Sequence, residues 1–327
     1  MAVGAMGPPI TNTVLTPATG ASNVREDLAD IIYEIDPYET PLVSAIGSKE
    51  ADQPMTEWLQ QLLMVADDNA QTEGFRYTAQ AAQGPNRLNN ICQIMFRGVT
   101  VTNTYRVSNS VGGDEWDRQS LLKGKELRRD LEWCVTRATI KTSAEPRRMS
   151  GIQTWMTNGS MGVGGNLPAT GNGTAAPVSG TARTLTLSLV ATAMQAAFTT
   201  GGHPSLILMS PRLKVVFSGL ALGGTGNPVV AQNMVATTQP HPVTIVGATD
   251  VYMSDFGRLD LAPDIFMPDN ILEMIDIDYA ELAPLPGRDM VLEEYAHVGD
   301  AQDGGVIFEG TLRVTAPNAH AMVGDLS

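Results

Sequence analysis

Residue types that commonly carry chemistry are present in this sequence, but their spacing forms no recognised catalytic or metal-binding motif. The four histidines are scattered along the chain: His203, His241, His297 and His320. None lies in an HExxH motif or a Cys/His cluster, so we expect solvated or structural side chains. No GxSxG motif is present, and the glycines of Met161–Asn166 lack the lysine and hydroxyl residue of a phosphate-binding loop. The sequence therefore predicts no catalytic, cofactor-binding or metal-binding residues.

Two short patterns imitate known sites. Asp255-Phe256-Gly257 has the letters of a kinase metal-binding motif, but the other kinase motifs are absent, and a hairpin turn is the better interpretation. Asp276 and Asp278 could offer oxygen ligands to Ca²⁺, which prefers several carboxylates. Because no loop has the DxDxDG spacing, a solvated strand face is the favoured interpretation of this pair.

The cysteines and the ends of the chain indicate a compartment. Cys92 and Cys134 match no CxxC pattern, so we expect two buried free thiols in a reducing cytosol, with a disulfide as the alternative. Met1–Val24 is small, polar and uncharged, as in a flexible arm, and the first basic residue, Arg25, follows it, so no secretory signal is indicated. The most hydrophobic stretch, Thr184–Pro211, is broken by two glycines and a proline, so no membrane span is predicted.

Charge is scarce and unevenly distributed in this chain of 327 residues. Charged residues make up 17%, against ~25% in ordinary soluble proteins, and the formal net charge is −14. Asp250–Ser327 holds 16 acidic and three basic residues, whereas Arg118–Arg148 holds nine basic and four acidic residues. This balance excludes a basic nucleic-acid-binding protein, and 43% hydrophobic residues exclude a disordered acidic tail.

Four long windows contain no charged residue: Met1–Val24, Met149–Ala182, Thr184–Pro211 and Val215–Thr249. Uncharged surface is typical of the centre of a protein–protein interface, where charged residues are depleted. We therefore interpret these windows as surfaces covered by other protein. Long disordered linkers are the alternative.

The first half of the chain predicts helices and a projecting arm. A helix capped by Ser22 or Asn23 is expected to run to about Ile35, and a second to begin at Thr40-Pro41 and stop at Gly47. Met55–Val65 and Asn90–Thr104 are expected to be strands. The polar segment Ala66–Asn89 between them predicts a projecting β-hairpin.

The strongest predicted helix is Gly113–Ile140, in which Arg128 and Glu132 are spaced to pair across one turn. The remaining predictions, in chain order, are a glycine-rich loop at Met149–Thr181, a helix at Leu185–Thr199, a strand at Ser205–Met209, a helix opened by Ser210-Pro211, a hairpin at Asp250–Ala262, and alternating strands at Ile271–Tyr279 and Val306–Val314. The inward residues of the last strand are expected to be Val306, Phe308, Leu312 and Val314. This mixture predicts an α+β fold.

Several segments, in order from residue 25 to the end of the chain, resemble one family. They are Arg25–Gly47 (REDLADIIYEIDPYETPLVSAIG), Gly124–Trp133 (GKELRRDLEW), His203–Pro211 (HPSLILMSP), Val251–Asp264 (VYMSDFGRLDLAPD) and Gly305–Leu326 (GVIFEGTLRVTAPNAHAMVGDL). Together they are similar to major capsid proteins of tailed bacteriophages with the Hong Kong 97-type fold. The glycine-rich insert at 149–181 has no counterpart in this resemblance and is interpreted as a surface loop.

The resemblance implies a domain organisation. Its parts are an N-terminal arm at 1–48, an extended β-hairpin loop at 49–104, a peripheral domain at 105–183 with a spine helix at 113–140, an axial domain at 184–284, and strands at 285–327 that return to the peripheral domain. It implies a non-enzymatic subunit of pentamers and hexamers in an icosahedral shell around double-stranded DNA, assembled in the bacterial cytoplasm. Scaffolding, portal and decoration proteins are the implied partners, with no membrane and no cofactor.

Basic residues of the predicted helix and arm are candidates for assembly contacts or for the lumen side of a shell: Arg118, Lys125, Arg128, Arg129, Arg76 and Arg87. The acidic final segment is expected to face solvent or a neighbour's arginines, because DNA repels carboxylates. Two other classes of function stay open: another virion or cell-surface structural protein (a decoration, tail or adhesin subunit), and a hydrolase with an unrecognised pair of carboxylates.

Overall fold

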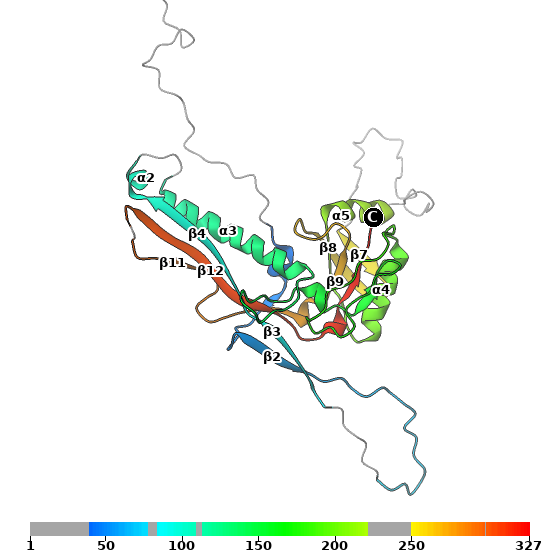
Figure 1. Ribbon diagram of the computed structural model, residues 1–327. Coiled ribbons are helices and arrows are strands. Elements are labelled where there is room, and N and C mark those ends of the chain that lie inside the picture. Colours follow the sequence, from blue (N-terminus) through cyan, green and yellow to red (C-terminus); the bar gives the residue numbers. More distant parts are fainter. Residues whose placement is uncertain (1–38, 78–83, 109–112, 222–249, 298) are drawn as a thin grey trace, which may run out of the picture.

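The computed structural model describes residues 39–77, 84–108, 113–221, 250–297 and 299–327 (Figure 1). The helix predicted near residues 22–35 and most of the predicted N-terminal arm lie outside the described residues. The first described helix, α1 (Pro41–Ala45), begins at the proline as predicted. Proline suits this position because its fixed φ fits the first turn, where its missing N–H would have no partner within the helix.

A long five-stranded sheet is organised around β12 (Ala301–Val314). β4 (Gln93–Thr102) pairs with one edge of β12, while β10 (Ala280–Pro284) and β11 (Val291–Glu294) pair with the other. β1 (Gly47–Ser48) adds a parallel strand to β10. The helix α3 lies lengthwise over this sheet (Figure 1).

The helix predicted over Gly113–Ile140 is confirmed as α3, but it is shorter at both ends and spans Glu115–Thr136. It begins where the Asp114 side chain accepts the N–H of Trp116. It ends at Thr136, where Arg137 turns to an extended conformation and Gln153 donates its side-chain amide to the carbonyl of Thr136 at 2.8 Å. This distant residue satisfies one of the carbonyls that a helix leaves open at its C-terminus.

The two strands predicted to form the hairpin pair with each other only at one end, where Met55 lies opposite Ile91 and Thr56 opposite Asn90. β2 (Met55–Gln60) pairs antiparallel with β3 (Asn86–Ile91), whose residues fall mostly in the segment expected to be the polar excursion. The strand is interrupted at Cys92, and the next strand, β4, pairs with β12. The break is fixed by the buried Asn90, whose side chain donates to the carbonyl of Leu312 and accepts the N–H groups of Ser150 and Ile91.

A second sheet has six strands. In spatial order they are β5 (Asn158–Ser160), β13 (Ala321–Val323), β9 (Leu272–Ile275), β6 (Leu206–Met209), β8 (Gly257–Pro263) and β7 (Val251–Ser254). The helices α4 (Leu187–Thr199) and α5 (Pro211–Ala221) pack against this sheet around a buried apolar cluster. The predicted helix, strand, helix and hairpin of this region are confirmed. The final strand was expected to return to the domain of the first sheet, but β13 pairs within this second sheet.

The alternating strand predicted over Ile271–Tyr279 is wrong beyond Ile275. Ile277–Tyr279 forms a short 3-10 helix, η3, because the side chain of Asp276 accepts the N–H of Asp278. Asp276 also accepts the N–H of His203, so it is a buried capping residue and not part of a solvated face.

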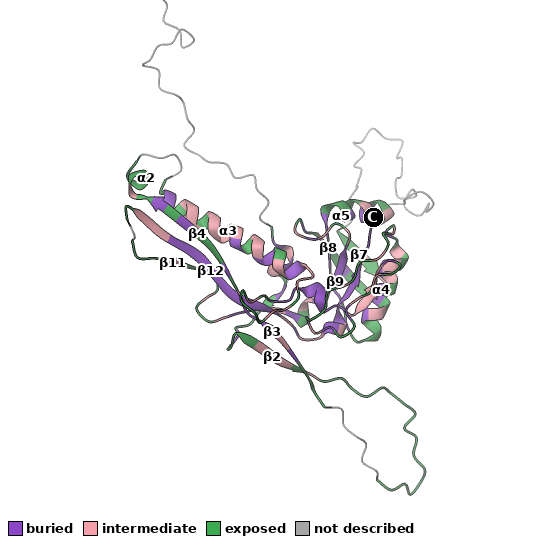
Figure 2. Cartoon of the chain, viewed as in Figure 1, coloured by how far each residue is buried: buried purple, intermediate pink, exposed green. Residues whose placement is uncertain are grey.

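The inward residues predicted for the last long strand are all buried: Val306, Phe308, Leu312 and Val314. The intervening residues Glu309 and Thr311 are buried as well, because β12 is covered on both faces near its end. Figure 2 shows this burial along β12 and in the second sheet, while the described residues between β2 and β3 are exposed.

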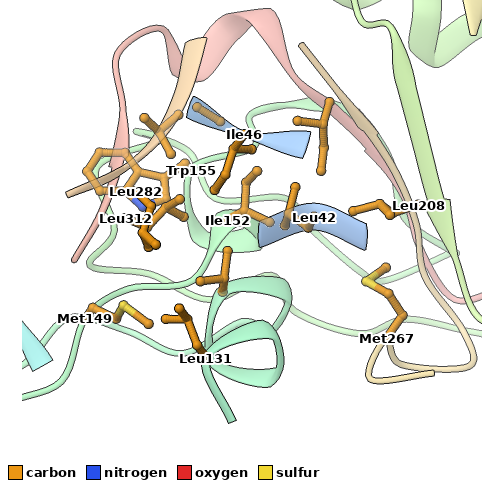
Figure 3. Close-up of a cluster of buried hydrophobic side chains, with 14 of the residues drawn as sticks. Leu42, Ile46, Leu131, Met149, Ile152, Trp155, Leu208, Met267, Leu282 and Leu312 are labelled. Carbon is orange, nitrogen blue, oxygen red and sulfur yellow. The ribbon is translucent and has the colours of Figure 1, made fainter. Parts of the chain in front are cut away.

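A large apolar core connects the two sheets to α1 and α3 (Figure 3). It gathers Leu42 from α1, Leu131 from α3, Trp155 from the glycine-rich segment, Leu208 from β6 and Leu312 from β12. Core contacts between segments so distant in sequence hold the projecting elements in fixed positions relative to the body.

Candidate assembly surfaces

The predicted basic residues of α3 are partly engaged within their own chain. Arg118 donates from Nε to the Glu115 carboxylate at 2.8 Å, and hydrogen bonding to this guanidinium lowers the pKa of Glu115. Lys125 is partly buried on the same helix. Arg129 lies over the ring of Phe266, with 5.8 Å between its guanidinium carbon and the ring centroid.

Arg128 and Glu132, predicted to pair with each other, form no ion pair and instead attach α1 to α3. Arg128 donates to the hydroxyl oxygens of Thr40 and Ser44 at 2.9 and 3.0 Å. The Glu132 carboxylate accepts the first free N–H groups of α1, which belong to Leu42 and Val43, at 2.7 and 2.8 Å. A carboxylate at the N-terminus of a helix satisfies open donors and interacts favourably with the helix dipole. Thr40 makes no side-chain cap to this helix, so Glu132 does the capping predicted for Thr40.

Burial raises the pKa of Glu132 to about 7, and the nearby carboxylate of Asp264 adds to this rise, while the two N–H groups of α1 and the charge of Arg128 oppose it. Burial also raises the pKa of Asp264 and, well above its usual range, that of Glu273 on β9. The end of α3 therefore meets the second sheet at a group of buried carboxyls.

The base of the hairpin is fixed to the body of the molecule. Trp58 of β2 packs against Trp155 with ring centroids 5.5 Å apart. Lys141 donates from Nζ to the backbone and side-chain oxygens of Asn89 on β3 at 2.8 and 2.6 Å. The Lys141 Nζ also lies 5.7 Å from the centroid of Trp155, and burial lowers the pKa of this lysine. These contacts set the direction in which the hairpin leaves the body.

Beyond Gln60 the hairpin exposes apolar side chains to an unusual degree. Leu63 and Val65 are 93% and 91% exposed, and Leu62 and Met64 are each 56% exposed. Arg87, predicted as an assembly residue, forms an ion pair with Glu57 at 3.3 Å across the two strands. Arg76 is exposed between Phe75 and Tyr77, which are 58% and 86% exposed. Contiguous exposed apolar residues of this kind mark interaction surfaces.

The glycine-rich insert is not a surface loop, because it encloses the end of the chain. The Asp325 carboxylate accepts the N–H groups of Gly162 and Gly180 at 2.9 and 2.8 Å. A Cβ on Gly162 would lie 2.0 Å from the carbonyl oxygen of Thr181, so only glycine fits there. Arg183 donates to the backbone and hydroxyl oxygens of Ser160 and to the carbonyl of Gly324. Much of this uncharged window is thus buried by its own chain.

The acidic final segment is also partly internal, contrary to the expectation that it faces solvent or a neighbour. Glu309 is buried and lies 3.2 Å from Nη2 of Arg147 and 2.8 Å from Nε of Arg288. Glu281 forms an ion pair with Arg313. These arginines belong to the same chain.

His320 is a buried structural histidine whose Nδ1 accepts the N–H of Asp276, and burial lowers its pKa to about 4. Cys92 and Cys134 are free thiols as predicted, but only Cys92 is buried, and Cys134 is partly buried. Among the described residues no group of three or more histidine, cysteine, aspartate or glutamate side chains is arranged to hold a metal ion. No helix in the described ranges is long and apolar enough to cross a membrane.

Comparison with known proteins identifies the family. The model of the SU10 major capsid protein family matches residues 9–327. The chain belongs to the SU10 major capsid protein family. This is a family of structural capsid proteins and not of enzymes, and it places the chain in the capsid of a virion.

Other major capsid proteins and capsid structures support the same conclusion for this SU10 family member. It is 28% identical over 135 residues to the major capsid protein of Escherichia phage Phieco32, a match that covers 41% of this chain and 38% of that relative. A chain of the cyanophage A-1(L) capsid superposes with a TM-score of 0.65 and 11% identity, covering 95% of this chain and 99% of that one. A chain of Mycobacterium phage Bobi gives 0.61 and 13%, with coverage of 94% and 97%. The fold is therefore the Hong Kong 97-type α+β fold expected from the sequence.

Sequence reasoning missed the residues that attach the projecting elements of this capsid protein. Glu132 and Asn89 act through partners 90 and 52 positions away. The one signal that pointed to Glu132 was the polar residue at a helical spacing otherwise occupied by the apolar residues Leu127, Leu131 and Val135.

Proposed function

We propose that this protein is the shell subunit of a tailed bacteriophage, forming pentamers and hexamers that close into an icosahedral capsid around double-stranded DNA. The observation that carries the proposal is the hairpin loop, which projects from the body with Leu63 and Val65 almost fully exposed. A chain on its own gains nothing from such exposure, whereas burying it in a neighbour stabilises association by about 25 cal/mol per Å² of apolar area.

Each predicted domain can be matched to one sheet and its helices, and this assignment is part of the proposal. The five-stranded sheet with α3 corresponds to the peripheral domain, and the six-stranded sheet with α4 and α5 corresponds to the axial domain. The N-terminal arm and the hairpin then link neighbouring copies. Linked contacts act at high effective concentration, so individually weak contacts produce a stable shell that can still correct its errors.

Partners and location follow from the same proposal. Assembly takes place in the cytoplasm of the host bacterium with separate scaffolding, portal and decoration proteins. DNA is held by weak, non-specific contacts, with Lys125 and Arg129 on α3 as candidates for the lumen side. Arg118 and Arg128 are further candidates on the same helix, although their guanidinium groups also contact Glu115 and the α1 hydroxyls.

The test is expression of the full chain, alone and with a scaffolding protein, followed by electron microscopy. Closed shells of uniform diameter are the expected result. If the chain unfolds cooperatively, and is therefore folded, but forms no particles, the proposal is contradicted.

A further inference from the structure

The five-stranded sheet has two faces, and α3 covers only one of them. Arg97 of β4 lies on the covered face, because its guanidinium donates to the Asp130 carboxylate of α3 at 2.6 and 2.8 Å. Side chains alternate between the two faces along a strand, so Ile94 and Phe96 lie on the opposite face. They are 48% and 46% exposed. The face away from α3 is therefore open at these residues in the part of the chain that the structure describes.

The strand register places apolar side chains of β4 and β11 together on this open face. Phe96 of β4 and Val291 of β11 lie opposite the same residue of β12, Ile307. Tyr295 follows four positions after Val291, and its ring centroid lies 6.2 Å from that of Phe96. Val291 and Tyr295 are exposed as well. We call Ile94, Phe96, Val291 and Tyr295 the apolar platform.

Glycines beside Phe96 give the platform its shape. A Cβ on Gly305 of β12 would lie 2.5 Å from the Phe96 ring, and a Cβ on Gly98 would lie 3.2 Å from it. The ring therefore packs over the backbone of two strands and is held in place before any partner binds. Three strands about 4.8 Å apart present a strip on the order of 10 Å wide, which is the diameter of one helix with its side chains. On the other face α3 already lies along the sheet in this way (Figure 1).

Two carboxylates border the platform. Glu293 alternates onto the open face along β11, and Asp303 does so along β12. Both are partly exposed, and neither side chain forms an ion pair or hydrogen bond with a described residue. Glu309, further along β12, is by contrast already paired with Arg147 and Arg288. The platform thus has a border of negative charge that its own chain does not neutralise.

This charge selects among the possible occupants. A second copy docked by the same face would bring its carboxylates against these two, and DNA would bring phosphates, so both are disfavoured by repulsion. Residues 22–35 of the chain itself hold four acidic residues and one basic residue, so their charge is also unsuitable. A helix with an apolar stripe flanked by lysine or arginine residues fits both the platform and its border.

We propose that the apolar platform binds an amphipathic helix of a separate protein, with its apolar stripe on Phe96 and Tyr295 and its basic residues beside Glu293 and Asp303. The sheet then lies between two helices, α3 and the bound one, as sheets do when both faces are covered. The surface is argued from this chain alone, whereas calling its occupant a partner of the shell subunit rests on the proposed function.

The test measures binding of a synthetic helix to the unassembled full chain by fluorescence anisotropy. The probe is a labelled peptide of about 18 residues, about 27 Å long as a helix, with leucines at helical spacing on one side and lysines elsewhere. A twin peptide has glutamate in place of lysine. Tyr295→Ser removes one ring of the platform. Tyr105→Ser on α2 (Asn103–Val107) is the matched control, because Tyr105 is 48% exposed against 45% for Tyr295.

A second pair of variants tests the charge at the border. Glu293→Gln with Asp303→Asn removes both carboxylates of the platform. Asp117→Asn with Asp255→Asn makes the same change in net charge at exposed positions on α3 and in the turn between β7 and β8. Urea midpoints of all variants are compared with wild type to establish that each one is folded.

Wild type is expected to bind the leucine–lysine peptide and to bind its glutamate twin far more weakly. Tyr295→Ser and the Glu293/Asp303 double variant should each weaken binding by about tenfold, and the double variant should also reduce its dependence on salt. Both controls should stay within about twofold of wild type. Equal binding of the two peptides, or controls that weaken binding as much as the platform variants, would overturn the proposal.

Photo-crosslinking to the wild-type chain gives an answer that does not depend on how the variants fold. A benzophenone in the apolar stripe of the leucine–lysine peptide is expected to link to platform residues, identified by mass spectrometry. Links confined to residues 61–77 or to α3 would overturn the proposal, because the peptide would then bind another exposed apolar surface.

Reconstruction of wild-type shells assembled without a partner separates this proposal from the proposed function. The platform is expected to be bare, and a segment of a neighbouring copy lying on it would overturn the proposal while leaving the proposed function standing. A chain that binds the probe at the platform but never forms shells would instead defeat the proposed function and leave the binding surface standing.

Discussion

Replacement of Glu132 by glutamine tests the attachment of α1 to α3 and the effect of burial on this carboxyl group. The side chain is fully buried and its two oxygens accept the N–H groups of Leu42 and Val43. At pH 5 the folded wild-type side chain carries a proton, but its hydroxyl oxygen can still accept an N–H; glutamine keeps one acceptor and turns an NH₂ group, which cannot accept, toward the other N–H, leaving a buried donor unsatisfied. Such a donor costs about 1–3 kcal/mol, so we expect Glu132→Gln to be about 2 kcal/mol less stable than wild type at pH 5.

The pH dependence of this difference has a definite sign. The pKa of Glu132 is raised from 4.5 to about 7 in the folded protein, chiefly by burial. A group with a raised folded pKa contributes stability that is complete below its unfolded pKa and is lost as pH rises through the folded value. At about 1.36 kcal/mol per pKa unit, wild type loses on the order of 3 kcal/mol between pH 4.5 and pH 8 through this group. Glutamine does not titrate, so Glu132→Gln is expected to match or exceed wild-type stability at pH 8.

The assay is urea unfolding of the unassembled full chain at pH 5 and pH 8, comparing midpoints at constant m-value. Glu126→Gln, on the same helix but partly exposed and paired with Lys123, is the matched control, and we expect a change within about 0.5 kcal/mol at both pH values. A Glu132→Gln variant that is more strongly destabilised at pH 8 than at pH 5 would refute the reasoning. It would mean that the two hydrogen bonds to the carboxylate outweigh its burial.

Three further predictions concern packing and assembly. Leu63→Asp combined with Val65→Asp should leave the urea midpoint of the unassembled chain unchanged but abolish shells in sedimentation analysis; normal shells would show that these side chains join nothing. Asn90→Ala should lower the free energy of unfolding by about 3 kcal/mol, because buried backbone groups lose their partners, and a loss below 1 kcal/mol in urea titration would contradict this. Gly162→Ala should destabilise the chain by about 2 kcal/mol or more through backbone overlap, whereas Gly124→Ala in α3, where nothing lies within 4 Å, should stabilise it by about 0.5–1 kcal/mol in the same assay.

Elements with local signals could be predicted from the sequence. The caps and periodicity of α3, the proline that begins α1 and the turn at Gly257 are determined within a few residues, so these elements occur close to where they were expected. The family resemblance supplied the overall architecture, which periodicity by itself could not have given.

Pairing and packing between distant segments could not be predicted in the same way. The polar segment Ala66–Asn89, with its glycines and proline, predicts an excursion where most of β3 lies, although the buried contacts of Asn90 to Leu312 and Ser150 hold β3 as a strand. The helical spacing predicts that Glu132 pairs along its own helix, but α1 packs beside it and two N–H groups of α1 donate to its carboxylate. The glycine-rich insert looked like a surface loop because the sequence does not reveal that its glycines allow close backbone contact around Asp325.

The central claim is that many copies of this chain close into a shell, and electron microscopy of the purified full-length protein tests it most directly. The account predicts closed particles of uniform diameter with rings of five and six subunits on their surface. A folded protein that stays monomeric under every assembly condition, or that forms only open fibres, would contradict it.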